Sequence, residues 1–430
     1  MLKIPAQAVV DRVRTSDGQR IAVIRTSDRG QFRACRRRWN WTSAMRENLR
    51  PIEQAGALWF GTGIHHALED YHGGGDYLLP EHAFDAYVQA TRRTQGEDYI
   101  LPPDHDDLLK MGYKMMEYYH KIWLKNRSPM KTFVWNGVPQ VEVNFIVEVP
   151  FPLKEFGYDK WWDKVVYAGT IDRVVEDEYG SLWLVDYKTA AKLTGSHLNN
   201  DPQVCTYSWL ASKYYGDQKI AGFIYWQFLK KVPKIPKPLK SGKISTAKNQ
   251  RVSAELYKIA LERKYGKLEF SPKENVDYYY RLMAQEGPDH DPFIRRTYVS
   301  RSQHAIEAEG QLIMMELEDM LNMDMPLYPN RNWMCGMCDW YEPCISLDDG
   351  SDWYEQIHNH YQVESPNMRN RWKAFQPAPE TYSDDYDPGD PMDIIIDGIE
   401  SGEMFADQNE ARDRELDEER RAAFNGEEDL

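Results

Sequence analysis

Two aspartates and a lysine in the middle of the sequence have the types and the spacing that metal-assisted hydrolysis requires. Asp172 lies in a β-branched segment, turn-forming residues 176–180 follow, and residues 181–188 form a second aromatic and β-branched segment that carries Asp186 and Lys188. This pattern predicts a β-hairpin. Because side chains alternate along a strand, Asp186 and Lys188 share one face, which Asp172 can approach from the neighbouring strand.

Two carboxylates and an ammonium group on one sheet face suit a hard divalent cation such as magnesium, which prefers oxygen ligands. A bound metal polarises a phosphate and lowers the pKa of a water molecule, and a lysine beside it can position or activate that water. The arrangement therefore predicts phosphodiester hydrolysis. The alternative is a plain ion pair between Asp186 and Lys188 on the surface of a hairpin, because short motifs often occur by chance.

Two predicted helices carry further polar groups. A small-residue segment leads into a helical pattern that contains His65, and an imidazole is a good partner for carboxylates at a transition metal. The alternative for His65 is a histidine on the helix surface, and the adjacent His66 is taken as an example of one. Farther along, Pro202 begins a helix that sets Gln203 and Tyr207 four residues apart on one face, where they can support the site.

Taken in order, four short motifs resemble the RecB-like branch of the PD-(D/E)XK nucleases. They are Gly61-x3-His65, Gly169-x2-Asp172-Arg173, Asp186-x-Lys188-Thr189 and Gln203-x3-Tyr207. The resemblance implies a magnesium or manganese ion held by His65, Asp172 and Asp186, with Tyr187 also at the metal, Lys188 as the catalytic lysine, and Gln203 and Tyr207 as a supporting pair. Many relatives carry glutamate where this chain has Asp186, and the motif allows either acid.

Five cysteines divide into a set of four and one that stands apart. An odd number without a signal peptide argues against a disulfide framework and predicts a reducing cytoplasm, in a bacterium or in a phage-infected cell. Cys205 lies within the Gln203–Tyr207 turn and is interpreted as a small packed residue. The other four could supply the thiolates of one metal site: Cys35, Cys335, Cys338 and Cys344.

One early cysteine with three clustered late ones resembles the AddB-like, CRISPR-associated and phage-encoded iron–sulfur exonucleases. That resemblance implies a [4Fe-4S] cluster that ties the two ends of the nuclease domain together, built from the segment around Cys35 and from residues 300–350. Four thiolates are the usual ligands of such a cluster, but they also form structural zinc sites. Zinc more often uses two paired knuckles, whereas Cys35 stands alone, so iron is favoured.

Charge is distributed unevenly along the 430 residues. The net charge is −15, and residues 380–430 alone carry 19 acidic residues and four arginines, so the remainder is neutral. This composition predicts a largely disordered tail over 376–430, with a short helix over 413–424. We expect the tail to aid solubility; the alternatives are an arm that binds a recombination or replication protein, or one that mimics DNA.

Positive charge concentrates around Cys35 and in residues 230–243, a run of lysines and prolines. The second run follows an apolar segment, 220–229, which predicts a buried strand, and it is too rich in proline to form a helix. Residues 230–243 are therefore expected to form a loop at the sheet edge whose lysines contact phosphates. The alternative is a basic loop that is simply solvated. No apolar run is long enough to span a membrane.

The remaining pattern predicts scaffold. Helices are expected over 106–125, 252–265 and 302–323, and strands over 140–151. There Glu142 and Glu148 are interpreted mainly as exposed strand positions, and the alternative is that one of them extends the site. The fold class is α/β: a restriction-endonuclease-like mixed sheet flanked by helices in residues 1–375, with a helical iron–sulfur region and an acidic tail.

Together these features predict a metal-dependent DNA exonuclease acting on single-stranded DNA in recombination, replication, repair or CRISPR adaptation. Two alternatives stay open. One is a zinc-stapled endonuclease on duplex or branched DNA, and the other is a non-catalytic, metal-stabilised DNA-binding subunit. The absence of a phosphate-binding lysine loop and of helicase motifs excludes ATP-driven unwinding from the expected activities.

Overall fold

The computed structural model describes residues 19–52, 56–75, 79–95, 105–127, 130–195, 198–216 and 218–363. The chain divides into two units, Met1–Phe375 and Gln376–Leu430. The second unit lies outside the described residues, and so do the acidic tail and the short helix predicted over 413–424.

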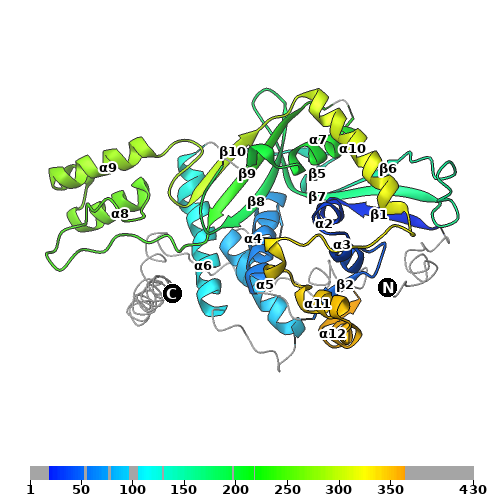
Figure 1. Ribbon diagram of the computed structural model, residues 1–430. Helices are drawn as coiled ribbons and strands as arrows, with labels where there is room; N and C mark the ends of the chain where they lie inside the picture. Colours follow the sequence, from blue (N-terminus) through cyan, green and yellow to red (C-terminus); the bar gives the residue numbers. More distant parts are fainter. Residues whose placement is uncertain are drawn as a thin grey trace, which may run out of the picture. The chain divides into compact units, whose positions relative to one another are not determined.

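A mixed seven-stranded sheet forms the centre of the first unit (Figure 1). Its strands follow the order β1-β7-β8-β9-β10, and β3 and β6 pair with β7 as well. The β1–β7 and β8–β9 pairs are parallel, and the others are antiparallel. The strands are β1 (Ile21–Arg25), β3 (Lys131–Thr132), β6 (Val141–Val149), β7 (Lys164–Glu176), β8 (Leu182–Ala190), β9 (Ile220–Leu229) and β10 (Ile294–Val299).

The predicted hairpin is present as β7 and β8, and the predicted apolar strand is β9 with the expected bounds. β9 lies between β8 and β10, and its residues from Gly222 to Leu229 are all buried. A continuous apolar run is what a strand covered on both faces requires. Two small sheets complete the strands: β2 (Leu49–Pro51) with β11 (Tyr361–Val363), and β4 (Val134–Trp135) with β5 (Val138–Pro139).

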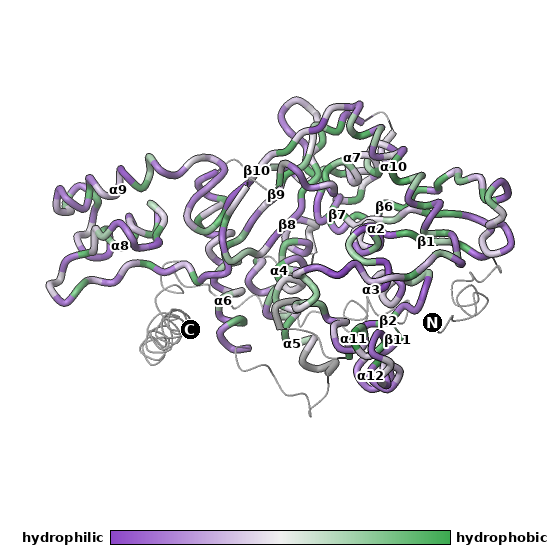
Figure 2. Tube along the Cα trace, viewed as in Figure 1, coloured by the Kyte–Doolittle hydropathy of each residue, from purple (hydrophilic) through white to green (hydrophobic). Residues whose placement is uncertain are grey.

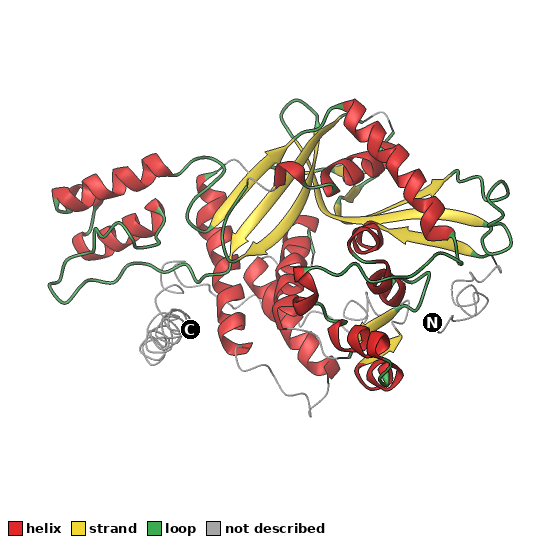
Figure 3. Ribbon diagram, in the orientation of Figure 1, coloured by secondary structure: helices red, strands yellow, loops and turns green. Residues whose placement is uncertain are grey.

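Helices cover both faces of the sheet (Figure 3). One face packs against α4, α5, α6 and the π-helical turn after α6, through a core that includes Ile64, Phe84 and Trp123. The other packs against α7 and α10 through Leu210 and Leu317. The α-helices are α2 (Thr26–Ala34), α3 (Arg36–Thr42), α4 (Gly56–Gly73), α5 (Pro80–Gln95), α6 (His105–Tyr118), α7 (Gln203–Tyr214), α8 (Ala254–Tyr265), α9 (Lys273–Gln285), α10 (Gln303–Leu321), α11 (Tyr341–Asp349) and α12 (Trp353–His360).

One predicted helix differs in detail from the expectation. The helix expected over 106–125 is α-helical only to Tyr118, then continues as a π-helix over Tyr119–Trp123 and a 3-10 turn over Leu124–Asn126. Further 3-10 turns are Leu198–Asn200, Leu268–Phe270 and Trp333–Met337. Among the described helices, none is both long enough and apolar enough to cross a bilayer.

The expected architecture is confirmed: a mixed sheet with helices on both faces, as in restriction-endonuclease-like folds. Residues 230–293 leave the sheet after β9, form α8 and α9, and return to β10 (Figure 1). The segment after α10 brings α11 and α12 back to the N-terminal helices, and β11 pairs with β2 there. This return places the late cysteines near the early one.

Candidate metal centre and active site

The two candidate aspartates lie where β7 and β8 separate. The ladder between these strands runs from Glu176↔Leu182 to Arg173↔Val185, so Asp172 and Asp186 are the next residues beyond its end. There the backbone N–H of Tyr187 donates to Asp172 Oδ2 at 2.6 Å. In a continuous ladder a backbone carbonyl would accept this hydrogen bond, but here the Asp172 carboxylate accepts it. The bond holds Asp172 against β8, and the predicted hairpin had placed Asp172 near this strand.

The strand β7 has an unusual environment at this point. On one edge, β1 pairs as far as Ala168, and β8 begins to pair only at Arg173. Among the described residues, Gly169 to Asp172 therefore have no ladder partner on this edge, although β6 pairs along the other. The motif Gly-x2-Asp occupies this interval, and side chains rather than a neighbouring strand approach it there, among them Thr26 and Tyr207 at Gly169.

Asp186 and Lys188 share a face of β8, as the alternation predicts. Lys188 Nζ lies 2.8 Å from both carboxylate oxygens of Asp186. Burial and the charge of Asp172 raise the pKa of Asp186 while Lys188 and His65 lower it, and together these effects bring it to about 6. Asp186 is buried whereas Lys188 is exposed, so the ammonium end of the pair faces outward. Asp186 Oδ2 is buried and ion-paired with Lys188, although no donor among the described residues meets hydrogen-bond geometry at this oxygen.

His65 comes to this site from α4. Its Nδ1 lies 3.2 Å from Asp172 Oδ1 and 4.0 Å from Glu142 Oε1. Burial lowers the pKa of His65, but the neighbouring carboxylates, Asp172 above all, outweigh it and raise this pKa to about 9. One ligand atom from each of the three residues lies within 4.8 Å of the others, which is a possible metal-binding group. A protonated imidazole here supplies the positive charge that a bound cation would supply.

Glu142 is a site residue for which the structure favours the alternative, an extension of the site, over the main sequence interpretation. It was interpreted as an exposed strand position, but its side chain is only 26% exposed and faces His65. The register Val141↔Arg173 and Val143↔Ile171 places Glu142 opposite Asp172. Glu142 has a φ of 45°, which turns the backbone locally out of the strand conformation. No sequence signal could reveal this, because it depends on the register between β6 and β7.

The neighbouring histidine also corrects an expectation. His66 was taken as an example of a surface histidine, but it is 5% exposed. Its ring packs on Tyr87, with 5.6 Å between ring centroids, and its Nδ1 lies 3.8 Å from Glu69 Oε2. Of the two adjacent histidines, His65 faces the carboxylates and His66 belongs to the packing between α4 and α5.

The helix α7 places Tyr207 against the carboxylates. Burial raises the pKa of Tyr207, and the charges of Asp186 and Asp172 raise it further. Its ring packs on Gly169, where an added Cβ atom would lie 2.9 Å from Cε1. Gln203 stands one turn earlier, but its side-chain amide makes no hydrogen bond with the described residues; only its backbone N–H donates, to Asp201 Oδ1 at 2.9 Å.

Tyr187 contributes to this site through its backbone. Its side chain lies on the opposite face of β8, with its hydroxyl 3.5 Å from Arg173 Nη1. Only its N–H group reaches the carboxylates, through Asp172. The side chain of Tyr187 is therefore not positioned as a metal ligand.

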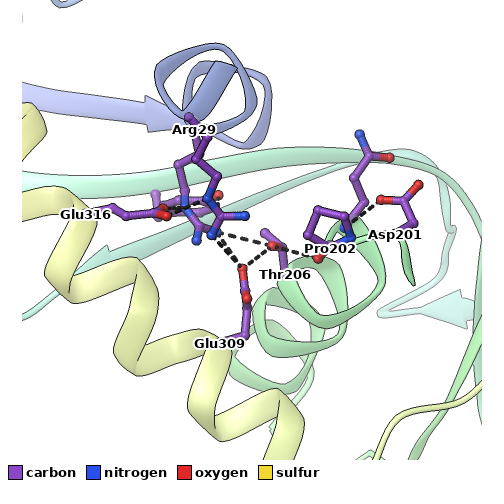
Figure 4. A network of polar contacts seen from close by, with 9 residues as sticks. Arg29, Asp201, Pro202, Thr206, Glu309 and Glu316 are labelled. Atoms are coloured by element: carbon purple, nitrogen blue, oxygen red, sulfur yellow. Dashed lines mark hydrogen bonds and ion pairs between the residues drawn. The ribbon is translucent and has the colours of Figure 1, made fainter. Parts of the chain in front are cut away.

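A buried ionic network fixes α7 relative to its neighbours (Figure 4). Arg29 of α2 donates to Glu309 Oε1 at 2.9 Å and to Glu316 Oε2 at 2.6 Å, both on α10. It also donates to Thr206 Oγ1 at 3.2 Å, and Thr206 in turn donates to Glu309 at 2.8 Å. Thr206 precedes Tyr207, so this network sets the height of α7 above the site. Because its members lie far apart in the sequence, no spacing pattern could predict it.

The candidate cysteines come together from the two ends of the described chain. The backbone N–H of Asn330 donates to Cys35 Sγ at 3.5 Å, and Arg37 Nη1 donates to Cys344 Sγ at 3.3 Å. Burial raises the pKa of the Cys344 thiol, Arg37 lowers it, and the nearby Cys35 contributes to raising it.

The four cysteine side chains are all partly buried. No three of their sulfur atoms lie within 4.8 Å of one another in the described part of the chain. Tetrahedral zinc, with Zn–S bonds of about 2.3 Å, would hold four sulfur atoms roughly 3.8 Å apart. In a four-iron cubane each thiolate binds a different iron, which requires wider spacing.

Comparison with known proteins adds one finding. Residues 27–344 match a family model described as PD-(D/E)XK nuclease superfamily. A search of curated proteins gave no match. The matched stretch spans α2 to α11 and contains every residue of the site described above.

Proposed function

Because the chain belongs to the PD-(D/E)XK nuclease superfamily, we propose that it is a metal-dependent deoxyribonuclease that degrades single-stranded DNA from an end. One observation carries the proposal: His65, Glu142 and Asp172 meet beside the Asp186–Lys188 pair. Carboxylates, an imidazole and a lysine are the groups that metal-assisted phosphodiester hydrolysis needs.

The donor set fits magnesium or manganese. Two carboxylates suit either ion, the imidazole suits manganese, and the buried Asp186 Oδ2, which is ion-paired with Lys188, is a further oxygen that a cation can use. We propose His65, Glu142, Asp172 and Asp186 as the ligands. When bound, the metal would polarise the scissile phosphate and lower the pKa of a water molecule.

The chain's own residues hold this arrangement. The Tyr187 N–H group orients the Asp172 carboxylate. Asp186 holds the Lys188 ammonium group, whose exposed position lets it contact the phosphate and position the attacking water. Tyr207 closes the α7 side of the site and excludes water there. Gln203 is proposed as a group that contacts the substrate, since its amide is not engaged by the described residues.

We further propose a [4Fe-4S] cluster on Cys35, Cys335, Cys338 and Cys344. The fit rests on the donors aimed at the sulfur atoms: Asn330 N–H at Cys35, Asn332 N–H at Cys335 (3.4 Å) and the Arg37 guanidinium at Cys344. Hydrogen bonds to sulfur stabilise thiolate ligands of such clusters. The cluster would join the N-terminal helices to the segment after α10.

The biological setting proposed is recombination, replication, repair or CRISPR adaptation in a reducing cytoplasm, bacterial or phage-infected. The acidic residues in 376–430 are proposed to aid solubility, and recruitment of a recombination or replication protein is the alternative. These assignments rest on composition and on the resemblance to iron–sulfur exonucleases.

Cleavage of end-labelled single-stranded DNA by wild type and by Lys188→Ala, each with manganese, magnesium or chelator, tests the activity. We expect metal-dependent cleavage in the wild type, reduced at least a hundredfold in the variant, and a product ladder that identifies the end attacked. Lys213→Ala, an exposed lysine near the far end of α7, is the matched control. Equal cleavage by wild type and Lys188→Ala would remove the lysine from the mechanism, and binding without cleavage would favour a non-catalytic subunit.

A further inference from the structure

The segment that leads from β9 to α8 is the most basic part of the chain. Residues 230–251 contain seven lysines, one arginine and no acidic residue, in a protein whose net charge is −15. Figure 2 shows this stretch as largely hydrophilic. So strong a local excess of one sign attracts a polyanion.

The lysines in the first part of this segment are exposed with a period of three. Lys231, Lys234 and Lys237 are exposed, whereas the residues between them, 232–233 and 235–236, are partly buried. The intervening Ile235 packs on the core cluster of the sheet. Proline-rich chain in the polyproline conformation has three residues per turn and rises about 3.1 Å per residue, which would place successive lysines on one edge roughly 9 Å apart. We name these three residues the lysine ridge.

The lysine ridge begins at the edge of the candidate active site. In the β8–β9 register Lys188 lies opposite Gln227, and the backbone N–H of Lys230 donates to Ala190 O at 2.8 Å. Lys230 Nζ also lies 5.7 Å from the centroid of the Phe60 ring on α4, the helix that carries His65. Lys231, the first lysine of the ridge, follows Gln227 by four residues, which is about 13 Å of extended chain.

We propose that the lysine ridge binds the phosphate backbone of the single DNA strand whose scissile phosphate occupies the site. This inference rests on the proposed function and names the path of its substrate. The ridge starts at the catalytic edge and leads away from it, so one continuous strand can occupy both. Every third residue of the ridge is an exposed lysine, and the residues between are partly buried. Such a surface suits contact with the phosphate backbone of DNA, which does not depend on the base sequence.

The test is a salt titration of binding with the full-length protein, labelled oligothymidine and chelator to prevent cleavage. The triple variant K231Q/K234Q/K237Q is compared with the charge-matched control K125Q/K154Q/K213Q, three lysines that are also exposed. Each single-strand phosphate contact contributes about 0.7 to the slope of log K against log salt, so the ridge variant should lose about 2 from this slope. We expect its Kd to rise at least tenfold at 0.1 M salt, with the control within twofold of wild type.

Two further measurements keep the result specific. The charge-preserving variant K231R/K234R/K237R should retain the wild-type slope, and the single variant K234Q should lose about one third of the total change. In cleavage assays the ridge variant should raise KM with kcat unchanged, because the ridge does not touch the reacting phosphate. Melting curves that match wild type exclude misfolding as the cause.

The outcomes separate this inference from the proposed function. If wild type cleaves DNA but the ridge and control variants have equal slopes, the ridge assignment is wrong and the nuclease stands. If wild type binds with the ridge-dependent slope but does not cleave, the ridge is supported and the nuclease fails. If labelled polyglutamate binds as tightly as DNA with the same ridge dependence, the surface is one for acidic proteins and the DNA assignment is overturned.

Discussion

The ring of Tyr207 lies directly against the backbone of Gly169, so closely that a Cβ atom at this glycine would stand 2.9 Å from Cε1 of the ring and 2.8 Å from Thr26 Oγ1. This contact explains why the Gly-x2-Asp and Gln-x3-Tyr motifs occur together: the absent side chain of one makes room for the ring of the other. It brings α7 down to the edge where Asp172 and Asp186 meet.

Gly169→Ala should therefore push α7 away from β7. We expect a loss of about 1–3 kcal/mol in the free energy of unfolding, the usual cost of overpacking, and at least a tenfold fall in cleavage rate. Gly30→Ala is the control, since a Cβ at this helical glycine meets nothing within 4 Å and should be neutral or stabilising. Denaturant unfolding and initial rates check both variants; a fully active, stable Gly169→Ala protein would contradict the explanation.

Glu142→Gln should weaken metal binding, whereas the same substitution at Glu148, on the same strand, should not. Replacing a carboxylate ligand by a neutral amide should raise the Kd for manganese by at least tenfold, as measured by calorimetry. The matched control is Glu148→Gln, because Glu148 is 63% exposed and pairs with Lys164 instead. If the two variants bind manganese equally well, Glu142 is not a ligand.

Arg29→Met should be strongly destabilising, because it removes the buried guanidinium partner of Glu309 and Glu316 and leaves them with only the partly exposed Arg33 as a cation. Breaking one partner of a buried ion pair typically costs about 3–5 kcal/mol. Arg33→Met removes a more exposed guanidinium from the same carboxylates, 32% exposed against 3% for Arg29, and should cost about 1 kcal/mol or less. Chemical denaturation measures both, and similar losses would argue against the network as the fixing element of α7.

Glu286 should make the protein less stable as pH rises. Burial raises the pKa of Glu286 to about 7, although the Ala254 N–H at 2.7 Å lowers it. Between about pH 4.5 and pH 7 the folded state therefore holds a proton that the unfolded chain releases, so this group's contribution to stability is greatest at low pH and falls through that window. Glu286→Gln should remove the loss, giving roughly 1–3 kcal/mol more stability at pH 8 than wild type and no gain at pH 4.5.

Thermal melting at the two pH values tests this prediction. An equal gain at both pH values would show that the effect of Glu286→Gln does not come from ionisation. The glutamine keeps an oxygen that can accept from Ala254, so the variant isolates the charge.

Cys35→Ser should release the metal of the cysteine site. Wild type purified without oxygen should be brown and contain about four iron atoms and sulfide, as a [4Fe-4S] cluster requires. Cys205→Ser is the control, because Cys205 lies on α7 apart from the other four and should keep full iron content. A colourless wild type loaded with zinc would overturn the cluster, and an iron-replete Cys35→Ser protein would remove Cys35 from the ligand set.

The sequence by itself determined the elements and most of the groups that the site uses. Alternation placed Asp186 and Lys188 on one face of β8, and the apolar run over 220–229 became β9 because a strand covered on both faces needs apolar side chains on both. Such local patterns depend only on neighbouring residues. They are therefore visible without the fold, and the family match supports the class of enzyme they suggested.

The tertiary structure alone decided which distant residues meet. Glu142 faces Asp172 because of a strand register, Arg29 joins α2 to α7 and α10 across long separations in sequence, and His66 is buried by the packing of α5. Register and helix packing arise from side chains on both partners at once, so neither sequence segment contains the information separately. For the same reason the path from Lys188 to the lysine ridge became visible only when β8 and β9 were paired.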